Sequence, residues 1–168
     1  MYYGNIEKHD IVNGPGVRTL LFVSGCTHKC RGCHNKESWD FEYGDIFTEK
    51  ERDLILEHMS SPMVKGFSLL GGEPFDNAED CIALLKAIKE KYPNKNIWVW
   101  SGYTFEHIIK HPIKKELLEL CDVLVDGKYV EALRDLSLYF RGSSNQRIIN
   151  IKESLERNEI VFDAHYYC

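Results

Sequence analysis

The chain lacks the long apolar runs and the excess of positive charge that indicate a membrane span or a nucleic-acid binder. No stretch of 18 apolar residues occurs in its 168 residues, so the sequence predicts no transmembrane helix. The N-terminal segment MYYGNIEKHD is too polar for a signal peptide. The net charge is −5 and no basic stripe dominates any segment, which argues against nucleic-acid binding. We therefore expect one cytoplasmic globular domain over residues 1–168.

The sequence also has too few clustered cysteines for a closed four-thiolate site. Only Cys26, Cys30 and Cys33 lie close together, in SGCTHKCRGCHN, and no second CxxC occurs. Cytoplasmic thiols stay reduced, so this loop is expected to bind a metal. Three interpretations remain open: an iron–sulfur cluster with one iron free of protein ligands, a structural cluster with a distant fourth cysteine, and zinc completed by His28 or His34.

Three other cysteines and two tryptophans lie outside this loop. Cys81 and Cys121 occur in apolar helical patterns and are expected in the core, whereas the position of Cys168 indicates no role. Trp98 and Trp100 alternate along an apolar run, which favours core packing over stacking on a ligand.

β-rich apolar runs alternate with helical patterns along the chain. Strands are predicted over 17–24, 66–70, 97–100 and 122–126, and helices over 48–59, 77–91, a short stretch after Thr104 and 114–121. The weaker runs 147–151 and 159–162 are candidates for further strands. This βαβα order predicts an α/β fold with a parallel sheet and right-handed crossovers.

An unusual sequence follows each of the four predicted strands. These are the cysteine loop, GGEPF (71–75), SGYTF (101–105) and GKY (127–129). The carboxyl ends of parallel strands meet at one edge, where α/β sheets and barrels hold their active sites. We therefore expect one site there.

The GGEP turn is a candidate ligand site. Gly71 and Gly72 permit positive φ angles and a close approach of the backbone to a ligand. The alternative is an ordinary tight turn from strand to helix. Beside a cluster iron that is free of protein ligands, the turn would suit a small ligand that chelates this iron through an amine and a carboxylate.

The cysteine loop and the GGEP turn together resemble the radical S-adenosylmethionine enzymes. The block DIVNGPGVRTLLFVSGC (10–26) is similar to the N-terminal signature of glycyl-radical-enzyme activases. VDGKY (125–129) and FRGSSNQRI (140–148) resemble the branch of anaerobic ribonucleoside-triphosphate reductase-activating proteins. The resemblance spans residues 10–148 in ordered blocks and implies a partial, open parallel β/α barrel.

The resemblance also implies cofactors and partners. Cys26, Cys30 and Cys33 would hold a [4Fe-4S] cluster with one open iron, and S-adenosyl-L-methionine would bind there. Its reductive cleavage would give a 5′-deoxyadenosyl radical that generates a glycyl radical on the large subunit of the anaerobic ribonucleoside-triphosphate reductase. A low-potential donor such as flavodoxin would supply the electron. No membrane or nucleic-acid partner is implied.

The resemblance assigns cofactor contacts but no acid–base catalyst. The implied contacts are Gly32, Cys33, His34, Gly71, Gly72, Glu73, Ser101, Asp126 and Lys128. Gly32 departs from the superfamily pattern, which often has an aromatic residue before the third cysteine, so adenine packing must come from elsewhere, such as His34 or a later strand. For Glu73 the alternative is that it orders the turn, for Ser101 a structural hydroxyl, and for Asp126 and Lys128 an ordinary surface pair.

Two arginines are candidates for anion contacts. These are Arg18 and Arg141, and Arg141 with residues 142–145 is expected at a docking surface or the cofactor rim.

Other functions remain as alternatives: an iron–sulfur electron carrier, a zinc-stabilised binding module, another glycyl-radical-enzyme activase, or a small-molecule radical enzyme of the 7-deazaguanine-pathway type. An electron carrier needs neither an iron free of protein ligands nor a GGEP turn. The block RGSSNQR favours the branch of reductase-activating proteins over the other radical enzymes.

Overall fold

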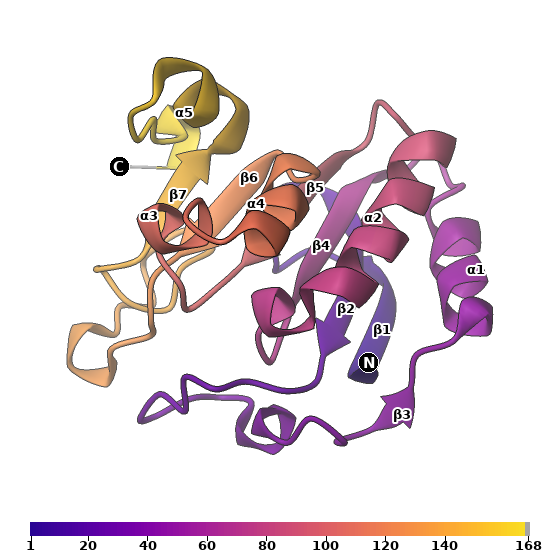
Figure 1. The fold of residues 1–168 in the computed structure, drawn as a ribbon, viewed down its shortest axis with the longest axis horizontal. Helices are drawn as coiled ribbons and strands as arrows, with labels where there is room; N and C mark the ends of the chain where they lie inside the picture. Colours follow the sequence, from indigo (N-terminus) through magenta and orange to yellow (C-terminus); the bar gives the residue numbers. More distant parts are fainter. Residues whose placement is uncertain (167–168) are drawn as a thin grey trace.

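A seven-stranded sheet forms the centre of the fold in the computed structural model, which describes residues 1–166 (Figure 1). Its strands are β1 (Tyr2–Asp10), β2 (Val17–Val23), β3 (Asp45–Ile46), β4 (Val64–Gly71), β5 (Asn96–Trp100), β6 (Val123–Asp126) and β7 (Arg147–Asn150). The α-helices are α1 (Glu49–His58), α2 (Ala78–Lys91), α3 (Phe105–Ile108), α4 (Pro112–Glu119) and α5 (Ile151–Arg157). Short 3-10 helices cover Lys36–Trp39, Pro74–Asn77, Glu131–Leu133 and Ala164–Tyr166. Within residues 1–166, every helix is too short or too polar to cross a lipid bilayer.

The sheet is parallel at its centre and antiparallel at both ends. The strand order is β3-β1-β2-β4-β5-β6-β7, and β2, β4, β5 and β6 pair in parallel as predicted. The β1 strand pairs antiparallel with both β2 and β3, and β7 pairs antiparallel with β6. In the described chain β3 and β7 do not pair with each other, so the sheet is open.

The predicted parallel sheet is confirmed for the four central strands, whereas the two ends of the sheet are antiparallel. Residues 127–146 return the chain to the edge they left without a long crossover helix, so β7 runs antiparallel to β6. The candidate strand 159–162 is wrong, because only an isolated bridge between Ile149 and Phe162 forms there. Residues 151–157 form α5, which the sequence did not predict.

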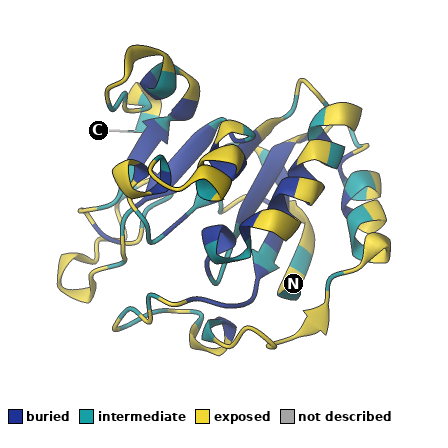
Figure 2. Cartoon of the chain, in the orientation of Figure 1, coloured by how far each residue is buried: buried dark blue, intermediate teal, exposed yellow. Residues whose placement is uncertain are grey.

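The helices α1, α2 and α4 cover one face of the sheet (Figure 1). Leu21, Leu69 and Val99 point from successive strands into a core that includes Ile55 of α1 and Leu85 of α2. Figure 2 shows the buried strands behind helices whose outer sides are exposed. Both Cys81 and Cys121 lie in this core, as predicted.

The opposite face of the sheet carries a smaller aromatic core. Trp98 is buried there with Val125 of β6, while Trp100, Phe140 and Tyr166 pack around them. The Trp100 Nε1–H donates a hydrogen bond to the Phe140 carbonyl at 2.9 Å. The prediction that Trp98 packs in a core is confirmed.

Arg18 is buried at the amino-terminal edge of the parallel strands and is not an anion-contact residue. Its Nε donates to Ser68 Oγ at 2.7 Å, and its Nη2 donates to the Phe67 and Asn96 carbonyls at 2.8 and 3.3 Å. The guanidinium also lies 5.8 Å from the centre of the Trp98 ring. Burial lowers the pKa of Arg18 to about 10. One arginine therefore ties β2, β4 and β5 together at the edge remote from the cysteine loop.

We predict that Arg18→Ala destabilises the fold. The change leaves several buried acceptors without donors and opens a cavity, at a cost of about 3 kcal/mol in the free energy of unfolding. Urea unfolding followed by circular dichroism measures it. The control is Arg31→Ala, because the Arg31 side chain is 94% exposed, and its loss should change stability by about 0.5 kcal/mol or less. Equal stabilities for the two variants would contradict this role of Arg18.

Candidate functional site

The four unusual sequences meet at the carboxyl edge of the parallel strands, as predicted (Figure 1). Backbone hydrogen bonds link them in pairs. The Glu73 N–H donates to the Gly25 carbonyl at 2.7 Å, which joins the GGEP turn to the start of the cysteine loop. The Gly127 N–H donates to the Tyr103 carbonyl at 3.2 Å, which joins the loops after β5 and β6. Parallel pairing therefore sets these segments side by side.

The carboxylate of Glu73 is the buried centre of this edge. Glu73 is 0% exposed and accepts hydrogen bonds from groups in three segments. Its Oε1 accepts from the Phe75 N–H at 3.0 Å and from Ser101 Oγ at 2.9 Å. Its Oε2 accepts from the Gly102 N–H at 2.8 Å and lies 2.8 Å from His28 Nε2. Glu73 and Ser101 thus hold the turn, the end of β5 and the cysteine loop in fixed positions.

Asp76 makes a second connection between the same segments. Its carboxylate accepts from the N–H and hydroxyl of Thr27, at 3.1 and 2.8 Å, and from the Tyr103 hydroxyl at 2.7 Å. Lys114 Nζ lies 3.4 Å from the same carboxylate. Burial acts to raise the pKa of Asp76, but the hydrogen bonds from Tyr103 and Thr27 outweigh it and lower that pKa. The sequence analysis missed Asp76, although it directly follows GGEPF.

The three clustered cysteines are free thiols in one loop. Cys26 is buried, and Cys30 and Cys33 are half-buried. Burial raises the pKa of the Cys26 thiol, while hydrogen bonds from the backbone at His28 and Lys29 act in the opposite direction. Within residues 1–166 no group of three or more His, Cys, Asp or Glu side chains is placed to hold a metal ion.

The second cysteine of the loop contacts the segment after β6. Burial and the neighbouring Cys33 raise the pKa of Cys30, whereas the charge of Lys128 and a hydrogen bond from the Tyr129 backbone lower it. Three free thiols with N–H groups directed at two of the sulfurs form a donor set that fits an iron–sulfur cluster, since such hydrogen bonds stabilise cluster thiolates. Lys128 is thus placed beside the loop.

The glycines of the site permit close packing of its loops. Gly71 has φ +121°, and a Cβ at Gly72 would clash with the Gly25 carbonyl. A side chain at Gly72 would therefore push the turn away from the cysteine loop. Gly32 has φ +74°, and a Cβ there would lie 2.8 Å from the Glu131 carboxylate. The turn thus depends on glycine for its contact with the cysteine loop, and the cysteine loop depends on Gly32 for its positive φ.

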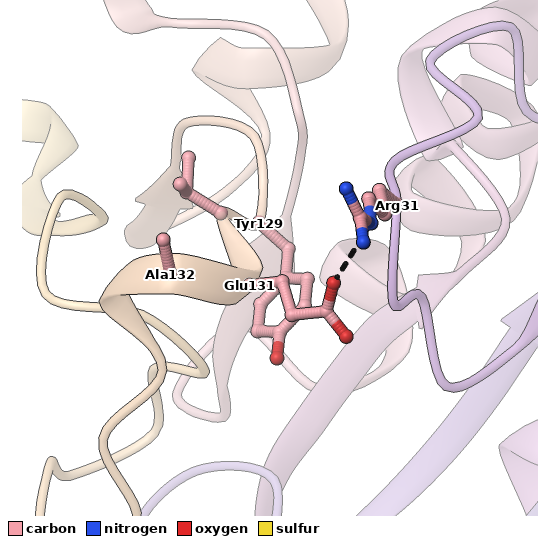
Figure 3. A pocket seen from close by; sticks show the side chains of 5 residues that line it. Arg31, Tyr129, Glu131 and Ala132 are labelled. Atoms are coloured by element: carbon pink, nitrogen blue, oxygen red, sulfur yellow. Dashed lines mark ion pairs between the residues drawn. The ribbon is translucent and has the colours of Figure 1, made fainter.

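A cavity of about 460 Å³ lies between the cysteine loop and the segment after β6 (Figure 3). Its lining includes Arg31, Tyr129 and Glu131. Arg31 Nε and Glu131 Oε2 form an ion pair of 3.2 Å across it, drawn in Figure 3. The ring of His34 lies beside the cavity lining, and its centre is 5.8 Å from the centre of the Tyr129 ring.

Asp126 is held inside the fold by a residue that the sequence analysis missed. Its Oδ1 accepts from Arg147 Nε at 2.9 Å, and its Oδ2 accepts from the Phe105 N–H at 2.7 Å. The alternative of an ordinary surface pair with Lys128 is excluded for Asp126, which is 0% exposed. Because Arg147 lies on β7, only the pairing of β7 with β6 reveals this contact.

Arg141 lies in the segment between β6 and β7. Its Nη1 donates to the Gln146 carbonyl at 3.3 Å, and the Gln146 side chain accepts from the N–H groups of Gly142 and Ser143. These bonds close the 141–146 turn on itself. Cys168 lies outside the described residues.

Comparison with known proteins identifies the family of the chain. A family profile described as "4Fe-4S single cluster domain" matches residues 12–149. The anaerobic ribonucleoside-triphosphate reductase-activating protein of Escherichia coli (strain K12) is 42% identical over 156 residues, which covers 90% of this chain and 100% of that protein. The chain belongs to this family of activating proteins. It therefore carries an iron–sulfur domain.

Family members from other sources cover nearly the same length. The protein of the same name from Pasteurella multocida (strain Pm70) is 43% identical over 152 residues, 88% of this chain and 96% of that protein. The one from Enterobacteria phage T4 is 41% identical over 150 residues, 88% of this chain and 93% of that protein. The branch to which the sequence blocks pointed is confirmed.

We predict that Glu73→Gln destabilises the site more than Ser101→Ala. The amide keeps one acceptor oxygen but turns an NH₂ group toward donors, which leaves buried N–H groups unsatisfied at a cost of about 2 kcal/mol. Ser101→Ala removes one donor and should cost about 1 kcal/mol. Urea unfolding of both variants measures the difference. A Glu73→Gln protein as stable as the unchanged chain would show that the carboxylate is not the buried centre described above.

Proposed function

We propose that the chain activates the anaerobic ribonucleoside-triphosphate reductase by radical chemistry with S-adenosyl-L-methionine. The observation that carries the proposal is the fixed connection of the three-cysteine loop to the GGEP turn through Glu73, in a member of the activating-protein family. A loop with three thiols leaves one iron of a four-iron cluster free, and the glycine turn beside it offers backbone groups to a polar ligand.

The cysteines are the proposed cluster ligands. Cys26, Cys30 and Cys33 would hold a [4Fe-4S] cluster. With that cluster bound, the site would supply one electron that cleaves S-adenosyl-L-methionine to methionine and a 5′-deoxyadenosyl radical, which takes a hydrogen atom from a glycine Cα of the reductase large subunit.

Other residues of the edge orient the cofactor. The backbone at Gly71 and Gly72 would face the methionyl group, and the backbone from Gly32 to His34 would face the adenosyl part. Tyr129 is a further aromatic candidate for packing against adenine, because it lies beside His34 in the wall of the cavity. Lys128 would place a positive charge near the cluster thiolates, where it favours their ionised form.

Buried carboxylates and their partners would position these groups without contacting the cofactor. Glu73 and Ser101 fix the turn, and Asp126 fixes the start of the segment that carries Lys128. The open sheet is proposed to be the partial barrel of the radical S-adenosylmethionine fold, within a single domain. Its open side leaves room for a loop of a protein substrate.

The first test of this function concerns the ligands. After anaerobic reconstitution, the unchanged chain should bind about four iron atoms, and dithionite with S-adenosyl-L-methionine should yield 5′-deoxyadenosine. Replacing Cys26, Cys30 or Cys33 by alanine should abolish that product. The control is Cys81→Ala, because Cys81 is buried in the helix core. Full product formation in any of the three loop variants would overturn the ligand assignment.

The second test concerns the protein substrate. Electron paramagnetic resonance of the chain mixed with the reductase, under reducing and oxygen-free conditions, should show a glycyl doublet only when S-adenosyl-L-methionine is present. The signal should vanish when the radical-site glycine of the reductase is changed to alanine. Accumulation of 5′-deoxyadenosine without any protein radical would instead indicate a small-molecule substrate.

A further inference from the structure

A row of four aromatic rings runs from the cysteine loop to the surface. The His28 ring lies edge-on to Tyr103, with ring centres 4.3 Å apart. Tyr103 stacks on His107 at 4.7 Å with an interplanar angle of 6°, and His107 stacks on His111 at 4.4 Å. His28 is nearly buried beside Glu73, whereas His107 and His111 are exposed. The row is therefore continuous from the site to solvent.

The rings of this row are held in place by the fold. His28 Nε2 pairs with the buried Glu73, and the Tyr103 hydroxyl donates to Asp76. Lys114 Nζ lies 3.6 Å from the centre of the Tyr103 ring and also pairs with Asp76. The row is thus a fixed path of π-systems from the cysteine loop to the turn between α3 and α4.

At the exposed end of the row the carboxylate of Glu106 is paired with Arg147, which leaves the positive charge of Lys110 uncompensated in a chain of net charge −5. Lys110 is exposed, and no ion pair to Lys110 occurs within residues 1–166. Loss of solvent, and then the positive charges of His111, Lys114 and Lys110, lower the pKa of His107, so its ring favours the neutral form and Lys110 supplies the positive charge. A local positive patch on an acidic protein attracts and orients an acidic partner.

We propose that the surface formed by His107, Lys110 and His111 is the docking site of an acidic low-potential electron-carrier protein, whose electron reaches the cysteine loop along the ring row. The inference rests on the proposed function, which needs one electron for each cleavage. The step oxidises the carrier by one electron and reduces the cluster on the cysteine loop by one. No bond in this chain forms or breaks.

Binding tests the docking surface without reference to activity. The cluster-loaded chain is titrated with a flavodoxin as the probe, and the dissociation constant is measured by calorimetry. Lys110→Glu should raise that constant about fivefold or more, because it replaces an attraction by a repulsion. The matched control is Lys50→Glu, which makes the same charge change on the exposed start of α1 and should leave binding within about twofold. Equal affinities for the two variants would overturn the docking surface.

A comparison of two reductants tests the route. His107→Ala should slow 5′-deoxyadenosine formation about tenfold or more at saturating flavodoxin, because it removes the middle of the exposed stack, and leave the dithionite-driven rate unchanged. An equal loss with both reductants would make the rings structural and overturn the route, as would no loss with flavodoxin. If the unchanged chain gives no product with dithionite, the proposed function fails, while the binding comparison still decides the docking surface.

Discussion

The geometry of the carboxyl edge of the parallel strands depends on the hydrogen bonds that one buried carboxylate accepts. Glu73 has no contact with solvent, so leaving its oxygens without donors would cost the full penalty of burying a charge. The donors come from its own turn, from the end of β5 and from His28 in the cysteine loop. Any movement of the cysteine loop away from the sheet would separate His28 from Glu73. The loop is therefore fixed to the sheet on the side of Cys26.

Sequence patterns predicted the strands that are continuous, buried apolar runs. The parallel strands β2, β4, β5 and β6 are apolar runs buried on both faces, and their predicted ranges match the structure closely. The β1 strand was missed because Tyr2–Asp10 is mostly exposed and polar, and its order comes from pairing with β2 and β3. The helix α5 was missed for a different reason, because it begins within the apolar run 147–151, which reads as a continuation of β7.

For the candidate site, sequence spacing located the segments but not the partners of their side chains. The cysteine loop, the GGEP turn and the loops after β5 and β6 were all placed at one edge, because topology alone determines that. The contacts of Asp126 with Arg147 and of Glu73 with His28 join residues far apart in sequence, so they depend on register and loop path. Arg18 was misassigned for the same reason, since its acceptors Ser68 and Phe67 come from a neighbouring strand.

The open sheet leaves separate surfaces for the two partners that the proposed chemistry requires, the protein substrate and the electron carrier. The site edge lies between the cysteine loop and the segment after β6, where a protein substrate must present a glycine within contact distance of a short-lived radical. The ring row leaves the same loop through Tyr103 toward α3 and α4, which belong to the helix-covered side of the sheet. A carrier that docks on the helices does not need the space that the substrate needs. Electron delivery and substrate docking can then take place without one partner displacing the other.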